Sequence, residues 1–289
     1  MIKPTAAAVL AALVSFTAPA AAQFSYTPKE KDQVGLDLGG QFWQSNASGS
    51  VGSGNIGQAP ALADVAFNNQ RQLSLVLAVQ HPYPWLPHLR IATTSLDTKG
   101  QTTLTKALPF ADKTFANGDA IESQLAVRFV DYSLYYELLN RKDLSFKLGL
   151  SARAFTGDVT LTKLATSTDD SCTDPDPTNG NNCPTPDTGT STSGQLQTDT
   201  ITPMLYIDSQ IRLPASHASV FATAEYAVLQ DHAVADYQAG VRYDLTRILK
   251  LDTEATIGYR LLQLQFEDLH SLYTDLKFQG VFVGMTAHF

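Results

Sequence analysis

The sequence predicts an all-β protein, specifically a ten-stranded antiparallel transmembrane β-barrel with short periplasmic turns and longer extracellular loops. Three observations lead to this prediction: segments of about ten residues alternate between apolar and polar positions, a secretory signal begins the chain, and an alternating strand ends it at Phe289. A tilted strand of about nine residues crosses a bilayer. Its alternation turns one face toward lipid and the other toward the lumen. We interpret the terminal aromatic residue Phe289 as an assembly signal.

The N-terminus has the features of a cleavable signal peptide. Residues 1–22 contain a basic start at Lys3, an apolar run over 6–16 and three alanines before Gln23. After Gln23, no stretch approaches the roughly 18 uncharged apolar residues that a spanning helix needs. We therefore expect a signal peptide at 1–22, and one barrel domain over 23–289 in the outer membrane of a Gram-negative cell.

Composition limits the partners. The formal net charge is −8, which argues against nucleic acid, because binding phosphates requires clustered Lys and Arg. The expected partners are outer-membrane lipid and, during biogenesis, the barrel-assembly machinery.

Period-two alternation locates the individual strands. They are predicted at 34–43, 72–80, 88–96, 124–139, 144–154, 200–213, 220–228, 235–246, 251–261 and 273–289. Ten is an even number, so both chain ends should lie on the same side of the membrane. The proline-rich stretch 81–88 predicts a rigid turn, and its Tyr83 and Trp85 suit the membrane interface. Within the sixth strand, Pro203 predicts a bulge.

Loops are expected where alternation stops. The Ser- and Gly-rich run 45–58 predicts a flexible loop, and 97–122 predicts strand extensions joined through Pro109 and 117–118. The longest low-complexity stretch, 166–194, predicts a surface loop. Its Cys172 and Cys183 are expected to form a disulfide in an oxidising compartment.

Charged residues recur on the face predicted to point inward. A soluble barrel would fill this space with apolar side chains, because an unpaired buried ion costs several kcal/mol. The mixed signs favour internal salt bridges over a one-sign filter, so we expect a polar, mostly occluded interior, with a narrow passage as the alternative. The predicted lumen-facing charges are Asp37, Arg90, Asp131, Glu137, Lys147, Arg153, Asp208, Arg212, Glu225, Arg242, Asp244, Asp252, Glu254 and Arg260.

No convincing catalytic, cofactor or metal site emerges from the sequence. Near the predicted surface, Asp231 and His232 with Asp268 and His270 could form an acid–base pair, similar to an omptin-type protease in residue types alone. The favoured function is a non-enzymatic, structural or passive, porin-like permeation role, including contact of the loops with an unidentified ligand. The alternative is an outer-membrane hydrolase, a protease or lipid-modifying enzyme.

Taken together, the signal, the first strand with Gly39 and Gly40, the proline-rich turn and the terminal Phe289 resemble a family of proteobacterial outer-membrane β-barrel proteins. The family is marked by a Gly-Gly pair near the mature N-terminus. The resemblance implies a barrel over the whole mature chain and no assigned activity, so it contributes no catalytic residues.

Overall fold

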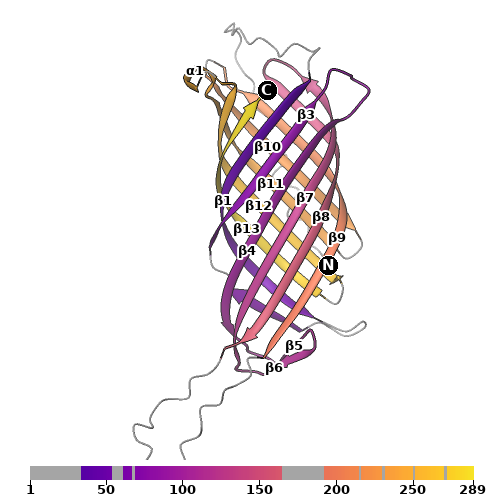
Figure 1. Cartoon of the computed structure of the whole chain (residues 1–289), viewed down its shortest axis with the longest axis vertical. Coiled ribbons are helices and arrows are strands. Elements are labelled where there is room, and N and C mark those ends of the chain that lie inside the picture. The colour runs from indigo at the N-terminus through magenta and orange to yellow at the C-terminus, as the bar shows by residue number, and fades with distance from the viewer. Residues whose placement is uncertain are drawn as a thin grey trace, which may run out of the picture.

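A computed structural model gives the architecture of the chain (Figure 1). It describes residues 34–53, 61–66, 69–164, 192–214, 216–229, 232–249, 251–269 and 272–289. The predicted signal peptide at 1–22 and both cysteines therefore lie outside the described residues. Within the described part of the chain, no helix is long and apolar enough to cross a membrane.

Long antiparallel strands make up nearly all of the described structure. Their bounds are β1 Gly35–Ser53, β2 Ala61–Ala66, β3 Gln70–Gln80, β4 His88–Thr103, β5 Leu108–Phe110, β6 Lys113–Phe115, β7 Ala120–Asn140, β8 Leu144–Lys163, β9 Ser193–Arg212, β10 Ala218–Leu229, β11 His232–Asp244, β12 Thr253–Leu269 and β13 Leu272–His288. One helical turn, α1 Thr246–Leu249, precedes β12.

The sheet closes on itself. Each strand pairs with its neighbour in chain order from β3 to β13, apart from the separate hairpin β5–β6, and β13 pairs with β1. At the closing seam, the Leu36 backbone N–H donates to the Phe289 carbonyl, and the Phe289 N–H donates back to Leu36. The prediction of a closed ten-stranded antiparallel barrel is confirmed, with β1, β3, β4 and β7 to β13 as the ten strands.

The barrel has two different ends. Connections 81–87, 141–143, 213–217 and 245–252 gather at one end, called the short-turn end, together with the C-terminus and α1 at the top of Figure 1. The opposite end carries the β5–β6 hairpin and is called the hairpin end. Here β8 and β9 are joined by residues 164–192, whereas β10 reaches Leu229 and β11 begins at His232.

Two predicted loop regions are strand instead. The predicted loop 45–58 is wrong over its first part, because β1 continues to Ser53 in register with β13. Likewise, the gap left between the last two predicted strands is occupied by β12, which reaches Leu269, and by β13, which starts at Leu272. In β1, cross-strand hydrogen bonds outweigh a local composition rich in Ser and Gly. In β12, residues 262–266 continue the alternation of apolar and polar residues, but in the opposite phase.

The predicted bulge at Pro203 is also absent. The β8–β9 ladder runs through Pro203 opposite Ala152 without a register shift. On its other side, the β9–β10 ladder ends at Leu205, two residues before the ladder would reach the proline, which has no N–H to donate. The register shifts lie elsewhere, at Glu137/Leu139 and Phe266/Leu269.

Close backbone approach requires glycine at position 149. A Cβ atom added to Gly149 would lie 2.1 Å from the Leu134 carbonyl oxygen and 2.6 Å from the Tyr135 Cα. Since backbone cannot yield as a flexible side chain does, we expect Gly149→Ala to lower the free energy of unfolding by about 1–3 kcal/mol. Gly157→Ala is the matched control on β8, because its Cβ would meet the Thr198 methyl group at 3.2 Å. Urea titration of both variants measures the difference; equal losses would contradict the prediction.

Candidate functional site

The barrel interior contains a salt-bridge cluster centred on Arg153, a side chain with no exposed surface. Its Nε donates to Asp131 Oδ1 at 2.6 Å. Its Nη2 donates to Asp131 Oδ2 at 3.0 Å, to Glu225 at 2.8 Å and to Asp236 at 2.9 Å. These residues come from β7, β8, β10 and β11, so one guanidinium connects four strands across the lumen.

Two further arginines balance the carboxylates of this cluster. Arg260 on β12 binds Asp236 through two hydrogen bonds, of 3.0 and 2.7 Å, and donates to Ser74 Oγ at 3.1 Å. On the other side, Arg90 Nη1 lies 3.4 Å from Glu225. Three guanidiniums thus face three carboxylates, which is how charges survive burial.

A second ion-pair group lies between this cluster and the short-turn end. The Asp208 carboxylate lies 4.0 Å from Lys147 Nζ and 3.7 Å from Arg242 Nη2, and it accepts a 2.7 Å hydrogen bond from Thr223. At the rim itself, the His288 ring lies 2.8 Å from Asp37 and 3.7 Å from Glu254.

The predicted lumen-facing charges have different environments. The buried ones are Asp131, Arg153, Asp208, Glu225 and Arg260. The half-buried ones are Asp37, Arg90, Glu137, Lys147, Arg212, Arg242, Asp244 and Glu254. The exception is Asp252, which is exposed in the turn before β12. Asp236, which receives hydrogen bonds from two arginines, was missing from the predicted set although it lies on the polar face of the strand predicted at 235–246.

Toward the hairpin end, the interior becomes apolar. The expectation of a polar lumen is therefore wrong for this half of the barrel. The change occurs where two arginines lie against rings: Arg153 over Phe129 at 4.0 Å and Arg260 over Trp43 at 4.8 Å. Beyond them, the buried side chains include Leu96, Ile121, Leu125, Val127, Phe155, Val159, Leu161, Leu262, Leu264, Phe266, Leu276 and Phe278.

Along the same strands, the outward face changes from apolar at the short-turn half to polar at the hairpin half. On the short-turn half of β7, Tyr132, Leu134, Tyr136 and Leu138 are exposed. On its hairpin half, the outward Arg128 is exposed, and the inward positions are buried and, apart from Ser123, apolar. The phase of the apolar alternation therefore inverts near Val130. An apolar outer belt surrounds the short-turn half alone.

Hairpin β5–β6 covers the apolar interior (Figure 1). Its Phe110 and Phe115 have no exposed surface. Asp119 fixes the connection between β6 and β7 to the end of β8. Its carboxylate accepts a hydrogen bond from the Ala116 N–H at 2.8 Å and lies 2.8 Å from Lys163 Nζ. The hydrogen bond from Lys163 lowers the pKa of Asp119, so this contact persists at neutral pH and is lost as the pH falls through that lowered pKa.

The predicted surface histidine pair falls largely outside the described residues. His232 begins β11, where its ring packs 5.9 Å from the Phe266 ring. Asp231 and His270 lie outside the described residues, and the side chain of Asp268 is not described. Among the described residues, no group of three or more His, Cys, Asp or Glu side chains could hold a metal ion.

Comparisons with known proteins give the fold. No protein-family model matches the sequence, and no curated protein matches it either. The structure is similar to the outer-membrane protease OmpT from Escherichia coli, with a TM-score of 0.51, 10% identity and coverage of 92% of this chain and 99% of that chain. The transport unit of the autotransporter AIDA-I from Escherichia coli has a TM-score of 0.42 and 10% identity, over 91% of this chain and 93% of that chain. The attachment invasion locus protein Ail of Yersinia pestis has a TM-score of 0.33 and 8% identity, over 89% of this chain and 99% of that chain.

Proposed function

We propose that this chain is an integral protein of the Gram-negative outer membrane, and that its closed barrel acts as a structural scaffold that presents loops at the cell surface. The observation that carries the proposal is the inversion of apolar alternation described above. An exposed apolar belt, with polar residues inward, suits a segment in lipid; a polar outer face around an apolar core suits a segment in water.

The dimensions of the belt agree with a bilayer. On β7, the apolar outward run spans 130–138, and on β8 it spans 144–154, close to the roughly 9–11 residues of a transmembrane strand. At the short-turn end, Tyr83 is 57% and Trp85 73% exposed, as expected for aromatic residues at a membrane interface. The Tyr136 hydroxyl donates to the Trp85 carbonyl and holds this turn against β7.

Orientation follows from the two ends. Short turns face the periplasm in barrels of this kind, and longer connections face outward. We therefore place the short-turn end in the periplasm and the hairpin end, with its strand extensions, outside the cell.

A scaffold is favoured over a pore because the lumen is filled at successive levels. The Arg153 cluster occupies its middle, and the apolar core fills the hairpin half under Phe110 and Phe115. A void beside Phe155 and Phe266 has a volume of about 20 Å³, room for about one water molecule. Ten strands lie close to the size at which side chains fill a barrel.

Planar-bilayer recording tests the closed lumen. We expect the wild-type protein to give no steady conductance. A variant lacking residues 105–118 should also stay silent, because the Arg153 cluster and its adjoining aromatic side chains still block the path. A porin reconstituted in the same bilayers serves as the positive control. Steady channels in the wild type would instead support passive permeation of small solutes.

A further inference from the structure

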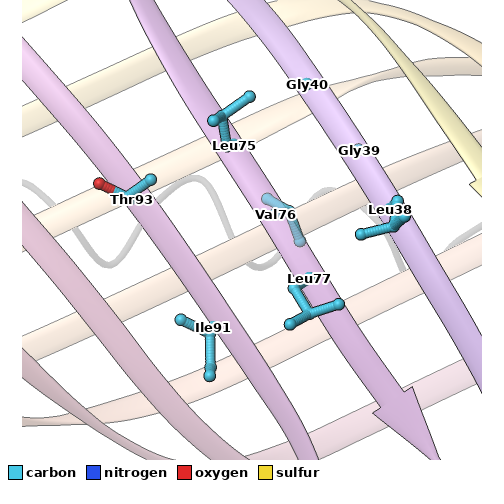
Figure 2. A pocket seen from close by; sticks show the side chains of 8 residues that line it. All are labelled: Leu38, Gly39, Gly40, Leu75, Val76, Leu77, Ile91 and Thr93. Carbon is cyan, nitrogen blue, oxygen red and sulfur yellow. The ribbon is translucent and has the colours of Figure 1, made fainter.

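A groove on the outer wall of the barrel is not explained by a scaffold role. It has a volume of about 450 Å³ and is lined by Leu38, Gly39 and Gly40 of β1, by Leu75, Val76 and Leu77 of β3, and by Ile91 and Thr93 of β4. Figure 2 shows the two glycines as a bare stretch of β1 beside the leucines of β3. The volume lies within the roughly 300–1,000 Å³ typical of small-molecule sites.

The groove exists because position 40 has no side chain. Gly40 lies on the outward face between Leu38, which is 45% exposed, and Phe42, which is 63% exposed. A Cβ atom here would make ordinary contacts, 3.4 Å from Leu75 Cδ2 and 3.9 Å from the Ser74 carbonyl. Packing therefore does not demand glycine at this position. By contrast, a Cβ on Gly39 would meet Thr286 Oγ1 at 2.9 Å.

The groove lies at the depth of the apolar belt. On β1, the apolar outward run ends after Phe42, so Leu38 and Gly40 are near its middle. Leu75 pairs directly with Gly40 on one side and Thr93 on the other. If the belt spans lipid as proposed, this notch faces acyl chains. An unfilled notch loses van der Waals contacts, which a flexible chain can restore.

Two cationic side chains lie at the surface-side border of the belt above the groove. Arg71 on β3 and Arg128 on β7 are exposed, and each is the first charged outward residue beyond the apolar run of its strand. They lie on either side of β4, where Ser95 pairs with both Leu73 and Arg128. No salt bridge within the described residues engages either guanidinium. Asp97, an exposed outward carboxylate on β4, lies level with Arg71 two positions beyond Ser95, so a bound phosphate must sit on the Ser95 side of the two arginines.

We propose that this wall binds one phosphorylated lipid of the surface leaflet. One acyl chain of the lipid occupies the groove over Gly40, and its phosphate is held by Arg71 and Arg128. Arginine suits this role because its planar fork can donate two hydrogen bonds to a phosphate. The inference rests on the proposed membrane location, and it adds a ligand class and a function for the Gly39–Gly40 pair.

Native mass spectrometry of the full chain tests the site. The protein is reconstituted in phosphatidylethanolamine vesicles containing bisphosphorylated lipid A, then extracted in mild detergent. We expect one retained lipid A per wild-type barrel. Retention should fall roughly tenfold in the double variant Arg71→Gln/Arg128→Gln and roughly fivefold in Gly40→Leu, whose side chain fills the notch. Dephosphorylated lipid A should be retained as weakly by the wild type as lipid A is by the double variant.

Matched variants keep the result interpretable. Ala154→Leu creates the same side chain at an outward position on β8, and Lys99→Gln removes an exposed outward cation from β4. Both variants should retain lipid like the wild type. Thr93→Trp fills the groove from β4 if Gly40→Leu does not fold. Equal retention by all variants would overturn the lipid site. A wild-type dimer that is lost in Gly40→Leu would also overturn it, because a second copy of the chain would then occupy the groove. Failure of the wild type to float with the vesicles would instead refute the membrane location.

Discussion

Replacing Arg153 with methionine is expected to lower the free energy of unfolding by about 3–5 kcal/mol, the range for removing one partner of a buried ion pair. The Arg153 guanidinium donates to Asp131, Glu225 and Asp236 and is fully buried. Without it, Asp131 keeps no salt bridge among the described residues. Glu225 and Asp236 then depend on Arg90 and Arg260. Urea unfolding in vesicles, followed by heat-modifiable gel mobility, measures the loss.

Two variants separate charge balance from general disruption. Lys99→Met removes an exposed cation from β4 and should change the free energy of unfolding by no more than about 0.5 kcal/mol. Adding Asp131→Asn to Arg153→Met removes the stranded carboxylate, so the double variant should recover part of the loss. A single-variant effect below about 1 kcal/mol would mean that the cluster does not hold the four strands together.

The architecture was predictable because apolar and polar residues alternate along a strand whose two faces have different surroundings. In the strand predicted at 124–139, Tyr132, Leu134 and Tyr136 alternate with Asp131, Ser133 and Glu137, and the structure places this sequence in β7. The burial of the ionic cluster follows the same alternation. Its pairing does not, because Arg153 on β8 and Asp236 on β11 are 83 positions apart in sequence. Two strands lie between β8 and β11, so strand register and the closure of the barrel together bring the two side chains into contact.

The apolar half of the lumen escaped prediction because most predicted strands stopped where the phase of the alternation inverts, for example at 43, 154 and 261, although β1, β8 and β12 continue beyond these positions. In the proposed membrane location, water replaces lipid outside the barrel above the belt, so the two faces exchange character while the strand continues. The inversion is marked by adjacent apolar residues, Phe129 and Val130 on β7 and Leu261 and Leu262 on β12. Such pairs, followed by alternation in the opposite phase, are the sequence signal that could have located the edge of the belt.

A charge placed at the middle of the outer belt tests the membrane location energetically. Leu150 on β8 is 71% exposed and lies between Leu134 of β7 and Leu205 of β9, midway along the apolar run 144–154. If this wall faces acyl chains, Leu150→Arg should lower the free energy of unfolding in vesicles by about 2–4 kcal/mol. In a water-soluble barrel, the same exposed substitution would change stability by no more than about 0.5 kcal/mol.

The matched control is Thr160→Arg, which places the same charge on the outward face of β8 beyond the apolar run. We expect little change there, because this position faces water in the proposed orientation. The cost of arginine should therefore fall with distance from Leu150 along one strand. Equal and small effects at both positions would contradict the lipid-facing assignment, whereas equal and large effects would show that arginine disrupts β8 itself, regardless of its surroundings.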